Sequence, residues 1–323
     1  MTAGLPAPPE AGAPEAAPAG HLAQAQWLKR WLTAVVRTAR PRQWPKNLLV
    51  FAAPLAGASL GRSGGLGYAL IAFAAFTAAS SAVYFVNDVL DAERDRGHPY
   101  KRHRPVAAGL LPPAQALVLA AACVAVAATA GFWIGEPGLS AAVGLYLVLS
   151  LAYTLGLKHV PVLELLLVAS GFVLRALGGA AATGVPPSGW FLVVCSLGAL
   201  MVAVAKRSME LAMLGADAAT HRPAMRSYTP VALRLGQLFL GAAMIVAYLL
   251  WAAGEHSSGT RAWHLASAVP LAAALIRFGK LSSGVASKPV EDLIARDAVM
   301  VSCELAWLLM FAAGLGAGLG VGL

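Results

Sequence analysis

Four oxygen-bearing side chains follow a long apolar stretch in the order Asn87, Asp88, Asp91 and Asp95. Because they are three and four residues apart, the three carboxylates share one face of any helix that continues through them, and Asn87 lies one turn below Asp91. Like charges this close repel unless a cation neutralises them. Carboxylate and amide oxygens suit hard ions, and Mg²⁺ is usually held by a few carboxylates plus phosphate oxygens. The cluster therefore predicts a metal-diphosphate site, with a solvated acidic helix end as the alternative.

Basic residues accompany this cluster in the sequence. Three cations follow the acids within HPYKRHRP, residues 98–105, namely Lys101, Arg102 and Arg104. Arg42 and Lys46, in RPRQWPKN, are four residues apart and share a helix face before the first apolar segment. For this second pair, a plain topology signal beside an interfacial tryptophan is the alternative.

Other ionisable residues lie inside apolar segments or at their ends, where such groups usually face an interior cavity and mark function. Arg175 is hard to explain as lipid-facing, because an unpaired Arg at a helix centre costs about 2.5–3.5 kcal/mol. We expect it to line a cavity on one helix stripe with Glu164, Val168, Gly171 and Gly178. Contact of its guanidinium with a backbone carbonyl and contact with a ligand are both open. Two further groups end apolar segments: Tyr153 with Lys158, and Lys206 with Arg207 and Glu210.

The elements that position these residues must be membrane helices. Hydrophobic residues make up 59% of the 323 residues and charged residues 12%, and the mean hydropathy is +0.69. A soluble domain carries about 25% charged residues, so an all-α, polytopic membrane helical bundle is predicted. Hydropathy predicts nine transmembrane helices, at residues 47–61, 67–90, 114–134, 138–157, 161–183, 188–209, 230–254, 262–280 and 297–320. We expect residues 26–323 to form a single catalytic domain and residues 1–25, rich in Ala and Pro, to be a disordered tail.

The distribution of basic residues orients the predicted bundle. With the N-terminus in the cytoplasm, all but three of the 24 Lys and Arg residues lie on the inner side, the exceptions being Arg62, Arg175 and Arg261. An inner excess of this kind indicates orientation by the positive-inside rule. We therefore expect a multi-pass plasma-membrane protein with its C-terminus outside and the acidic cluster on the cytoplasmic face.

Several other kinds of site are disfavoured. The seven histidines show no HxxxH or HExxH pairing and the three cysteines form no CxxC, which argues against a zinc site or a disulfide. The segment KPVEDLIARDAV, residues 288–299, contains Glu291, Asp292 and Asp297 after a proline. Acids that follow a proline are typical of a helix N-terminus, so helix capping and salt bridging are favoured there over a catalytic role.

Together these motifs resemble a known family. NDVLDAERDRGHPYKRHRP, residues 87–105, is similar to the first aspartate-rich motif, NDxxDxxxD, of the UbiA-type intramembrane prenyltransferase superfamily. The resemblance implies a nine-helix bundle that uses Mg²⁺ and a diphosphate at the cytosolic side of a lipid-accessible cavity. One branch, the decaprenyl-phosphate phosphoribosyltransferases of arabinan-building bacteria, is resembled more closely through RPRQWPKN, YTLGLKHVPVLE, LRALGGAAATGVP, AKRSMEL and PVEDLIARDAV. The resemblance covers about residues 38–312, and it implies a homotrimer.

One departure separates that branch from the general superfamily. Ordinary members carry a second DxxxD motif after the sixth span, where this chain has Lys206, Arg207 and Glu210. Two cations suit a phosphate that is bound directly, without an intervening metal. The lipid would then be a polyprenyl monophosphate acting as acceptor, and the diphosphate would come from phosphoribosyl pyrophosphate.

On this resemblance each candidate residue has an expected role. Mg²⁺ on the donor's diphosphate would be held by Asn87, Asp88, Asp91 and Asp95. The donor's 5-phosphate would be bound by Lys101, Arg102 and Arg104. The acceptor phosphate would be bound by Arg42, Lys46, Lys206 and Arg207, with Tyr153 and Lys158 completing the wall. Glu210 would orient the neighbouring cations. The expected product is decaprenylphosphoryl-5-phosphoribose, a precursor for cell-wall arabinan.

Two other functions stay open. A prenyltransferase that joins a prenyl diphosphate to an aromatic acceptor shares the fold, and a second aspartate pair would support it. An anion transporter could use the basic inner loops, although the sequence shows no inverted repeat. For the favoured function we expect the sugar donor, the lipid and the membrane as partners, and no nucleic acid.

Overall fold

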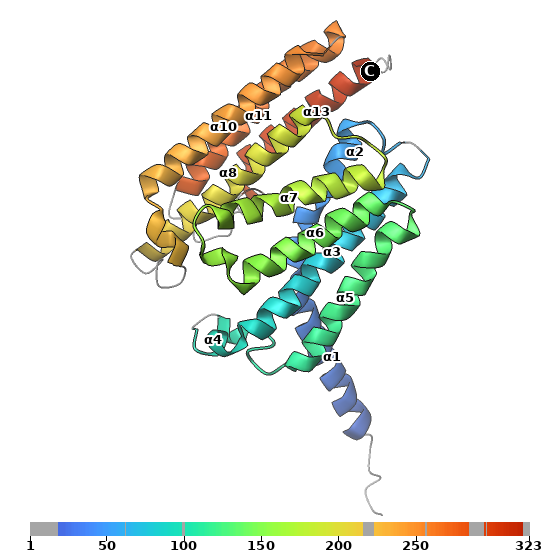
Figure 1. Ribbon diagram of the computed structural model, residues 1–323, viewed down its shortest axis with the longest axis vertical. Coiled ribbons are helices and arrows are strands. Elements are labelled where there is room, and N and C mark those ends of the chain that lie inside the picture. The colour runs from blue at the N-terminus through green and yellow to red at the C-terminus, as the bar shows by residue number, and fades with distance from the viewer. Residues whose placement is uncertain are drawn as a thin grey trace, which may run out of the picture.

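The computed structural model describes residues 19–61, 63–98, 101–215, 223–255, 257–283, 294 and 296–318. All regular elements in these ranges are helices (Figure 1), so the all-α prediction is confirmed there. The first helix, α1 (Ala19–Ala39), begins inside the stretch that the sequence predicts as a tail. Residues 1–18 of that stretch lie outside the described ranges.

Eight helices of the described chain are long and apolar enough to cross a membrane. They are α3 (Gly65–Leu90), α5 (Pro113–Trp133), α6 (Pro137–Leu155), α7 (Leu163–Ala182), α8 (Gly189–Leu214), α10 (Pro230–Ala253), α11 (Ser258–Ser283) and α13 (Ala298–Gly318). Each begins and ends within a few residues of a predicted span, except that α8 continues to Leu214, past the expected end at residue 209. Lys206 and Arg207 therefore lie well inside a helix.

The first predicted span, residues 47–61, is built differently from the other eight. It contains the end of a 3-10 helix, η1 (Pro41–Phe51), and a short α-helix, α2 (Ala52–Ala56). Pro45 and Pro54 lack backbone N–H groups, which disfavours one continuous α-helix. η1 crosses α7 at Gly179, where an added Cβ would lie only 1.7 Å from the carbonyl oxygen of Val50. This span is thus a short segment packed on α7, and the expected count of nine full helices is not confirmed.

The long helices form two groups that α7 joins (Figure 1). In one group α8 packs against α10 and α11, and α11 packs against α13. In the other, α3, α5 and α6 pack together, with α1 along α3. α7 contacts both α6 and α8, so its residues are placed to reach both groups. The stripe predicted on this helix does face inward, because Glu164, Gly171, Arg175 and Gly178 are buried.

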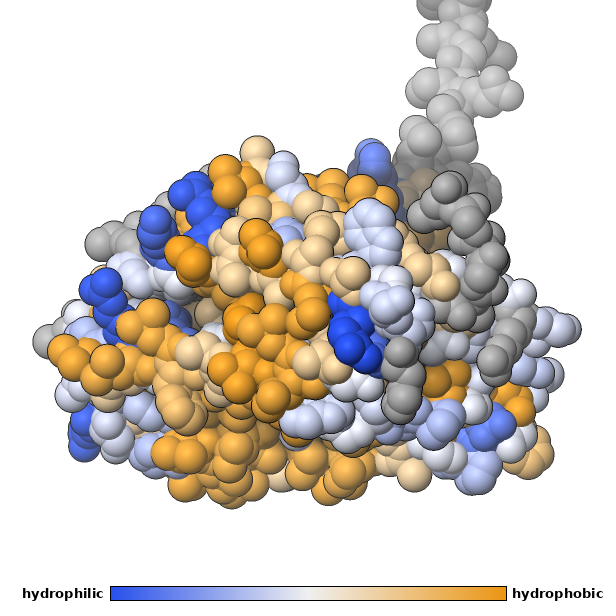
Figure 2. Space-filling view, turned by 90° about the horizontal axis from the view of Figure 1, so that it is seen from above, coloured by the Kyte–Doolittle hydropathy of each residue, from blue (hydrophilic) through white to orange (hydrophobic). Residues whose placement is uncertain are grey.

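The outer surface of the bundle is largely apolar. Phe132, Trp133, Phe239 and Leu309 are among its most exposed side chains. Figure 2 shows broad apolar areas that only a few hydrophilic side chains interrupt. Exposed apolar surface of this extent indicates contact with lipid, and the apolar helices show an integral membrane protein.

Candidate active site

The acidic cluster lies where α3 ends. Helical hydrogen bonds continue past Leu90, because Asp91 N donates to Asn87 O (2.9 Å) and Asp95 N donates to Asp91 O (2.8 Å). α4 (Ala92–Arg96) therefore extends the helical register and keeps the three carboxylates on one face, as predicted. Their environments differ, because Asp88 and Asp95 are buried whereas the side chain of Asp91 is 27% exposed.

Two arginines, one from far along the chain and one from the same motif, neutralise the buried carboxylates. Arg40 Nη2 lies 2.5 Å from Asp88 Oδ1, and Arg104 Nη1 lies 2.7 Å from Asp95 Oδ2 and 3.6 Å from Asp88 Oδ1. Arg40 stands between α1 and η1 with a φ of 54°, a left-handed conformation that non-glycine residues rarely adopt. Its guanidinium lies 4.6 Å from the centre of the Tyr84 ring. Sequence reasoning used Arg40 only as a topology charge, although it opens the RPRQWPKN motif.

The other oxygens of the cluster make weaker contacts with the protein. Asn87 Oδ1 is buried and has no hydrogen-bond partner among the described residues. Asp91 Oδ1 forms two long ion pairs, with Lys158 Nζ at 3.8 Å and with Arg94 Nη1 at 3.9 Å. A buried acceptor without a donor, one turn from a partly exposed carboxylate, fits a hard cation that takes its other ligands from a substrate.

The described residues do not by themselves form a metal cage. In the described part of the chain, no three His, Cys, Asp or Glu side chains converge into a metal-binding group. The reason is that Asp88 and Asp95 are bound to arginines. Of the four predicted ligands, Asn87 then keeps an oxygen without a described partner, and Asp91 keeps a partly exposed carboxylate. The donor set therefore fits Mg²⁺ bound together with phosphate oxygens, which is how this ion is usually held.

A second charged cluster lies between α7 and α8. Arg207 is buried; its Nε lies 2.9 Å from Glu164 Oε1, and its Nη1 donates to Glu210 Oε2. Glu164 is fully buried and also accepts a hydrogen bond from Tyr228 OH at 3.3 Å. The Tyr228 hydroxyl in turn accepts one from Val162 N at 2.9 Å. Arg207 is thus bound to protein carboxylates on two sides, and Tyr228 is a member of the cluster that sequence reasoning missed.

The environment of Tyr228 keeps its hydroxyl protonated, so that it can donate a hydrogen bond. Burial raises the pKa of Tyr228 above its usual value of 10.0, and the nearby Glu164 carboxylate raises it further. The phenol therefore keeps its proton at neutral pH and can hold Glu164. Lys206, next to Arg207 on α8, is half-buried, and its Nζ lies 5.8 Å from the centre of the Phe172 ring.

Arg175 sits at the centre of a buried polar network. Its Nε donates to Asn47 Oδ1 (2.7 Å), its Nη1 to Gly171 O (2.6 Å) and its Nη2 to Tyr146 OH (3.1 Å). Of the two contacts left open by the sequence, the backbone carbonyl contact is present. Asn47 and Tyr146 come from η1 and α6, so this network ties three elements together. Neither partner was foreseen, because nothing in the local sequence marks them.

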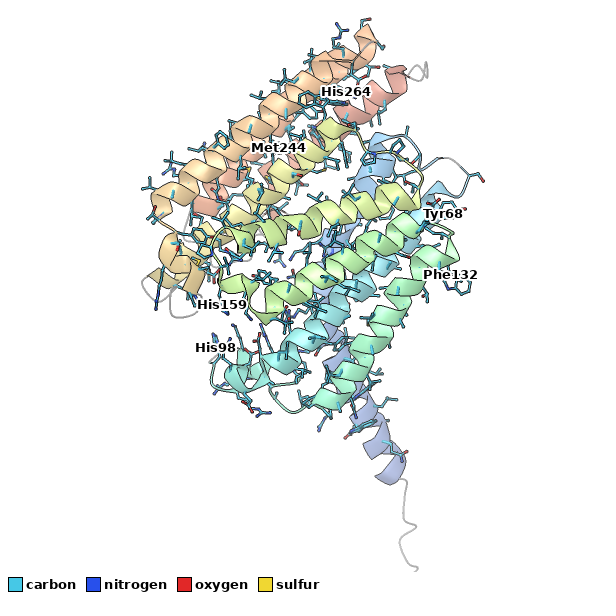
Figure 3. All side chains as sticks on the ribbon, viewed as in Figure 1. Tyr68, His98, Phe132, His159, Met244 and His264 are labelled. Atoms are coloured by element: carbon cyan, nitrogen blue, oxygen red, sulfur yellow. The ribbon has the colours of Figure 1, made fainter. Side chains whose placement is uncertain are left out.

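The remaining candidate residues have more peripheral positions. Tyr153 is half-buried near the end of α6, and the turn after it brings Lys158 to Asp91. Figure 3 marks this end of the molecule with His98 and His159. Lys46 donates to Gln43 Oε1. Exposed cations complete the set: Arg42, Lys101 and Arg102.

The acids of the segment 288–299 separate into two cases. Glu291 and Asp292 lie outside the described residues. Asp297 accepts a hydrogen bond from Met300 N (2.9 Å) at the start of α13, and it pairs with Arg277 through contacts of 3.1 and 2.6 Å. Capping and salt bridging are therefore confirmed for Asp297.

Comparison with known proteins decides the family. A model of the UbiA prenyltransferase family matches residues 48–289. The chain belongs to the UbiA prenyltransferase family. It is 39% identical over 296 residues to a Mycobacterium tuberculosis protein named decaprenyl-phosphate phosphoribosyltransferase, covering 89% of this chain and 96% of that one. A Corynebacterium glutamicum protein of the same name is 36% identical over 286 residues, covering 87% and 86% respectively.

Solved structures support the same fold. A UbiA homolog from Archaeoglobus fulgidus bound to GPP and Mg²⁺ superposes with a TM-score of 0.64, covering 88% of this chain and 98% of that one. The two sequences are 14% identical, so this likeness concerns the fold alone. The UbiA-like helical bundle expected from the sequence is thereby confirmed.

This UbiA-family chain also contains an apolar groove between the helices that carry the second cluster and α6. A cavity of about 310 Å³ lies between α6, α7 and α8, and its lining includes Leu145, Leu149, Leu166, Val173 and Leu200. Leu149 precedes Tyr153 by one turn of α6, and Leu166 follows Glu164 closely on α7. Among the described residues, the lining itself contains no charged residue, and its apolar character suits a hydrocarbon chain.

Proposed function

We propose that this UbiA-family chain transfers the 5-phosphoribosyl group from phosphoribosyl pyrophosphate to a polyprenyl phosphate, releasing diphosphate. Decaprenyl phosphate is the proposed natural acceptor, and the product serves cell-wall arabinan synthesis. Relatives at 39% and 36% identity that carry the name decaprenyl-phosphate phosphoribosyltransferase support this assignment over most of the chain.

The observation that carries the proposal is the contrast between the two charged clusters. The end of α3 presents a partly exposed carboxylate beside an amide oxygen that has no described partner, which suits a metal-bound diphosphate. α8 instead presents Lys206 beside Arg207, close to an apolar groove. One cluster suited to a metal and one suited to a bare phosphate match a diphosphate donor and a monophosphate acceptor.

The donor side of the proposed site is built around Asn87 and Asp91. When bound there, Mg²⁺ would neutralise charge on the leaving diphosphate. Asp88 and Asp95 are proposed to share this task by fixing Arg40 and Arg104, whose half-buried guanidiniums border the same face. Lys101 and Arg102 are exposed on the neighbouring η2 (Lys101–His103), and their proposed role is to bind the sugar's 5-phosphate.

The acceptor side is assigned to residues at the end of the groove. We place the polyprenyl chain in the groove and its phosphate against Lys206, with Arg42, Lys46, Tyr153 and Lys158 as further contacts. Arg207 is already bound to Glu164 and Glu210, so its proposed role is to position α8 and, through it, Lys206. Arg175, held by Asn47 and Gly171, is likewise proposed to order the helices that line the site.

The proposed reaction is a substitution at C1 of the ribose. An oxygen of the lipid phosphate forms the new bond to C1 while the bond from C1 to the diphosphate oxygen breaks. The second pKa of a phosphate monoester is about 6, so the acceptor is largely dianionic at pH 7 and needs no general base. In-line attack on an α-configured donor gives the β-linked phosphoribosyl lipid.

Two wider features of the proposal concern the whole protein. The N-terminus and the active site are proposed to face the cytoplasm, where a water-soluble sugar donor is available. The excess of basic residues in the predicted inner loops supports this orientation. A homotrimer remains the expected assembly. Mass determination of the detergent-solubilised protein by light scattering tests the trimer, and a reporter fused after Leu323 tests the location of the C-terminus.

The purified protein in detergent with Mg²⁺ tests the activity directly. With phosphoribosyl pyrophosphate and decaprenyl phosphate, we expect a lipid product carrying phosphoribose and an equal amount of diphosphate. A parallel reaction supplies a prenyl diphosphate and an aromatic acid, for which we expect no product. Prenylated aromatic product in the second reaction, with none in the first, would place the chain among the general prenyltransferases instead.

A further inference from the structure

Helix α1 has three distinct faces beyond the site described above. Its inner face carries the buried Ala34 and Thr38, and Ala34 packs with Trp31 and Val35 against a cluster at the ends of α3 and α5. Trp31 Nε1 also donates to Gln115 Oε1 at 2.7 Å. These contacts fix the rotation of α1, so the orientation of its other faces is determined by the bundle.

The second face of α1 is apolar and exposed. Leu28, Leu32 and Val36 follow one another at intervals of four residues, which places them on one stripe, and all three are about half exposed. Trp27, which stacks on Trp31, is exposed as well. Figure 1 shows the N-terminal part of α1 extending beyond the ends of α3 and α5. No part of the described bundle covers the stripe.

The third face is basic and lies directly beside the apolar stripe. This face contains Lys29, Thr33 and Arg37, which are again spaced by four residues. Each of them follows a residue of the apolar stripe by one position, and Arg30 lies next to them. Together with Ala34 and Leu110 they line a groove of about 240 Å³. The sequence of α1 contains no Asp or Glu, so no carboxylate of the helix balances these three cations.

We propose that this groove binds the phosphate headgroup of an anionic phospholipid of the same leaflet, while the apolar stripe inserts among its acyl chains. An amphipathic helix with basic and apolar faces side by side lies in the membrane interface, and juxtamembrane cations attract anionic lipids. The exposed Trp27 suits the same depth. Free phosphate would satisfy the cations alone, whereas a lipid headgroup with its attached chains accounts for both faces.

The position of α1 links this groove to the acidic cluster. Arg37 Nη2 donates to His103 O at 3.2 Å, and His103 precedes Arg104, which holds Asp95. At the other side, α1 ends at Ala39, next to the Arg40 that holds Asp88. Lipid bound along α1 therefore stabilises the segments that carry both arginines. This consequence rests on the proposed function, but the lipid site does not.

Spin-labelled phosphatidylglycerol and phosphatidylcholine measure the site in the full-length protein reconstituted in bilayers. For the wild type we expect more immobilised phosphatidylglycerol than phosphatidylcholine. In the variant Lys29→Gln/Arg30→Gln/Arg37→Gln this preference should fall at least about threefold, because each cation near the surface contributes attraction. The pair Lys29→Gln/Arg30→Gln, which keeps the Arg37 bond to His103, should show an intermediate loss.

A matched control removes three exposed arginines from other elements, in the variant Arg96→Gln/Arg226→Gln/Arg234→Gln. It lowers the net charge equally and should keep most of the preference for phosphatidylglycerol. Equal losses in the two triple variants would mean that total charge, and not the groove, selects the lipid, and would overturn the proposal. Displacement of phosphatidylglycerol by inorganic phosphate at matched ionic strength would also overturn it, because the groove would then take free phosphate. Both readouts are independent of transferase activity.

Discussion

The two charged clusters of this protein use the same residue types in opposite arrangements. At the end of α3, acids from two successive helical turns are met by Arg40 from before α3 and by Arg104 from the loop after α4, and Asp91 remains 27% exposed. Between α7 and α8, a single Arg207 is enclosed by Glu164 and Glu210, and Glu164 is fully buried. The first cluster keeps one carboxylate, Asp91, partly exposed, whereas both carboxylates of the second are directed at its arginine.

This difference suits the first cluster to ligand binding and the second to structural support. An open carboxylate can exchange a weak internal contact for a stronger one with a metal-bound substrate. A fully buried carboxylate bound to a guanidinium cannot leave its partner without leaving a charge uncompensated in the interior. We therefore expect changes in the first cluster to affect turnover and changes in the second to affect stability.

The largest effect is expected from Asp91→Ala, which removes the open carboxylate. Turnover should fall at least about a hundredfold, the scale of losing a main electrostatic stabiliser, while the thermal midpoint changes little. Transfer of labelled phosphoribose in detergent measures the first quantity and a melting curve the second. Glu93→Ala is the matched control, because Glu93 is exposed two residues away and should keep activity. Near wild-type turnover in Asp91→Ala would remove the metal assignment.

In the second cluster, Glu164→Gln should destabilise the protein without an equal loss of chemistry. Removing one partner of a buried ion pair costs about 3–5 kcal/mol, so the thermal midpoint in detergent should fall clearly. Glu210→Gln is the comparison, because the side chain of Glu210 is 24% exposed and solvent can replace the lost charge. A larger loss for Glu210→Gln than for Glu164→Gln would show that burial does not decide the strength of this cluster.

The variants Lys206→Ala and Arg207→Ala distinguish the roles of two neighbouring cations, one in lipid binding and one in stability. We expect Lys206→Ala to raise the KM for polyprenyl phosphate about tenfold, the scale of one charge-assisted hydrogen bond, with an unchanged KM for the sugar donor. Arg207→Ala should mainly lower the thermal midpoint, and Arg207→Lys should restore it only in part, because an ammonium cannot replace the guanidinium fork. If Arg207→Ala instead raises the lipid KM at wild-type stability, Arg207 binds the phosphate itself, as the sequence alone predicts.

The smallest effect concerns an ion pair outside both clusters. The hydrogen bond from Arg277 lowers the pKa of Asp297 from 3.8 to about 2. Because the folded-state pKa lies below the ordinary value, the pair stabilises the protein above about pH 4 and loses this contribution as the pH falls toward 2. Thermal midpoints at pH 5 and pH 3 should therefore differ less in Asp297→Asn than in the wild type. An unchanged difference would mean that the pair does not contribute to stability in this pH range.

Local sequence was sufficient for most of the helices and for the acidic face. Runs of apolar residues long enough to cross a bilayer predicted eight helices with small errors at their ends, because membrane insertion depends on the composition of each segment. The spacing of Asp88, Asp91 and Asp95 placed them on one face, because helical periodicity relates residues that are close in the chain. The same reasoning gave the wrong structure for the first span, which was predicted as one membrane helix. Its prolines and its close packing on Gly179 are instead found with a 3-10 helix, η1, and a short α-helix, α2.

The partners of the charged residues were decided only by the tertiary structure. Arg40 and Asp88 are 48 residues apart, Arg175 and Asn47 are 128 apart, and Tyr228 and Glu164 are 64 apart. No local pattern can select such pairs, because the distance between them depends on how α1, η1 and α7 pack together. The sequence by itself thus determined which residues are available for chemistry and on which helix face they lie. Packing then determined that Asn87 Oδ1 has no described partner and that Asp91 is partly exposed, whereas Arg207 is bound to two carboxylates. A buried charge must pair with an opposite charge, and the fold decides which one lies within reach.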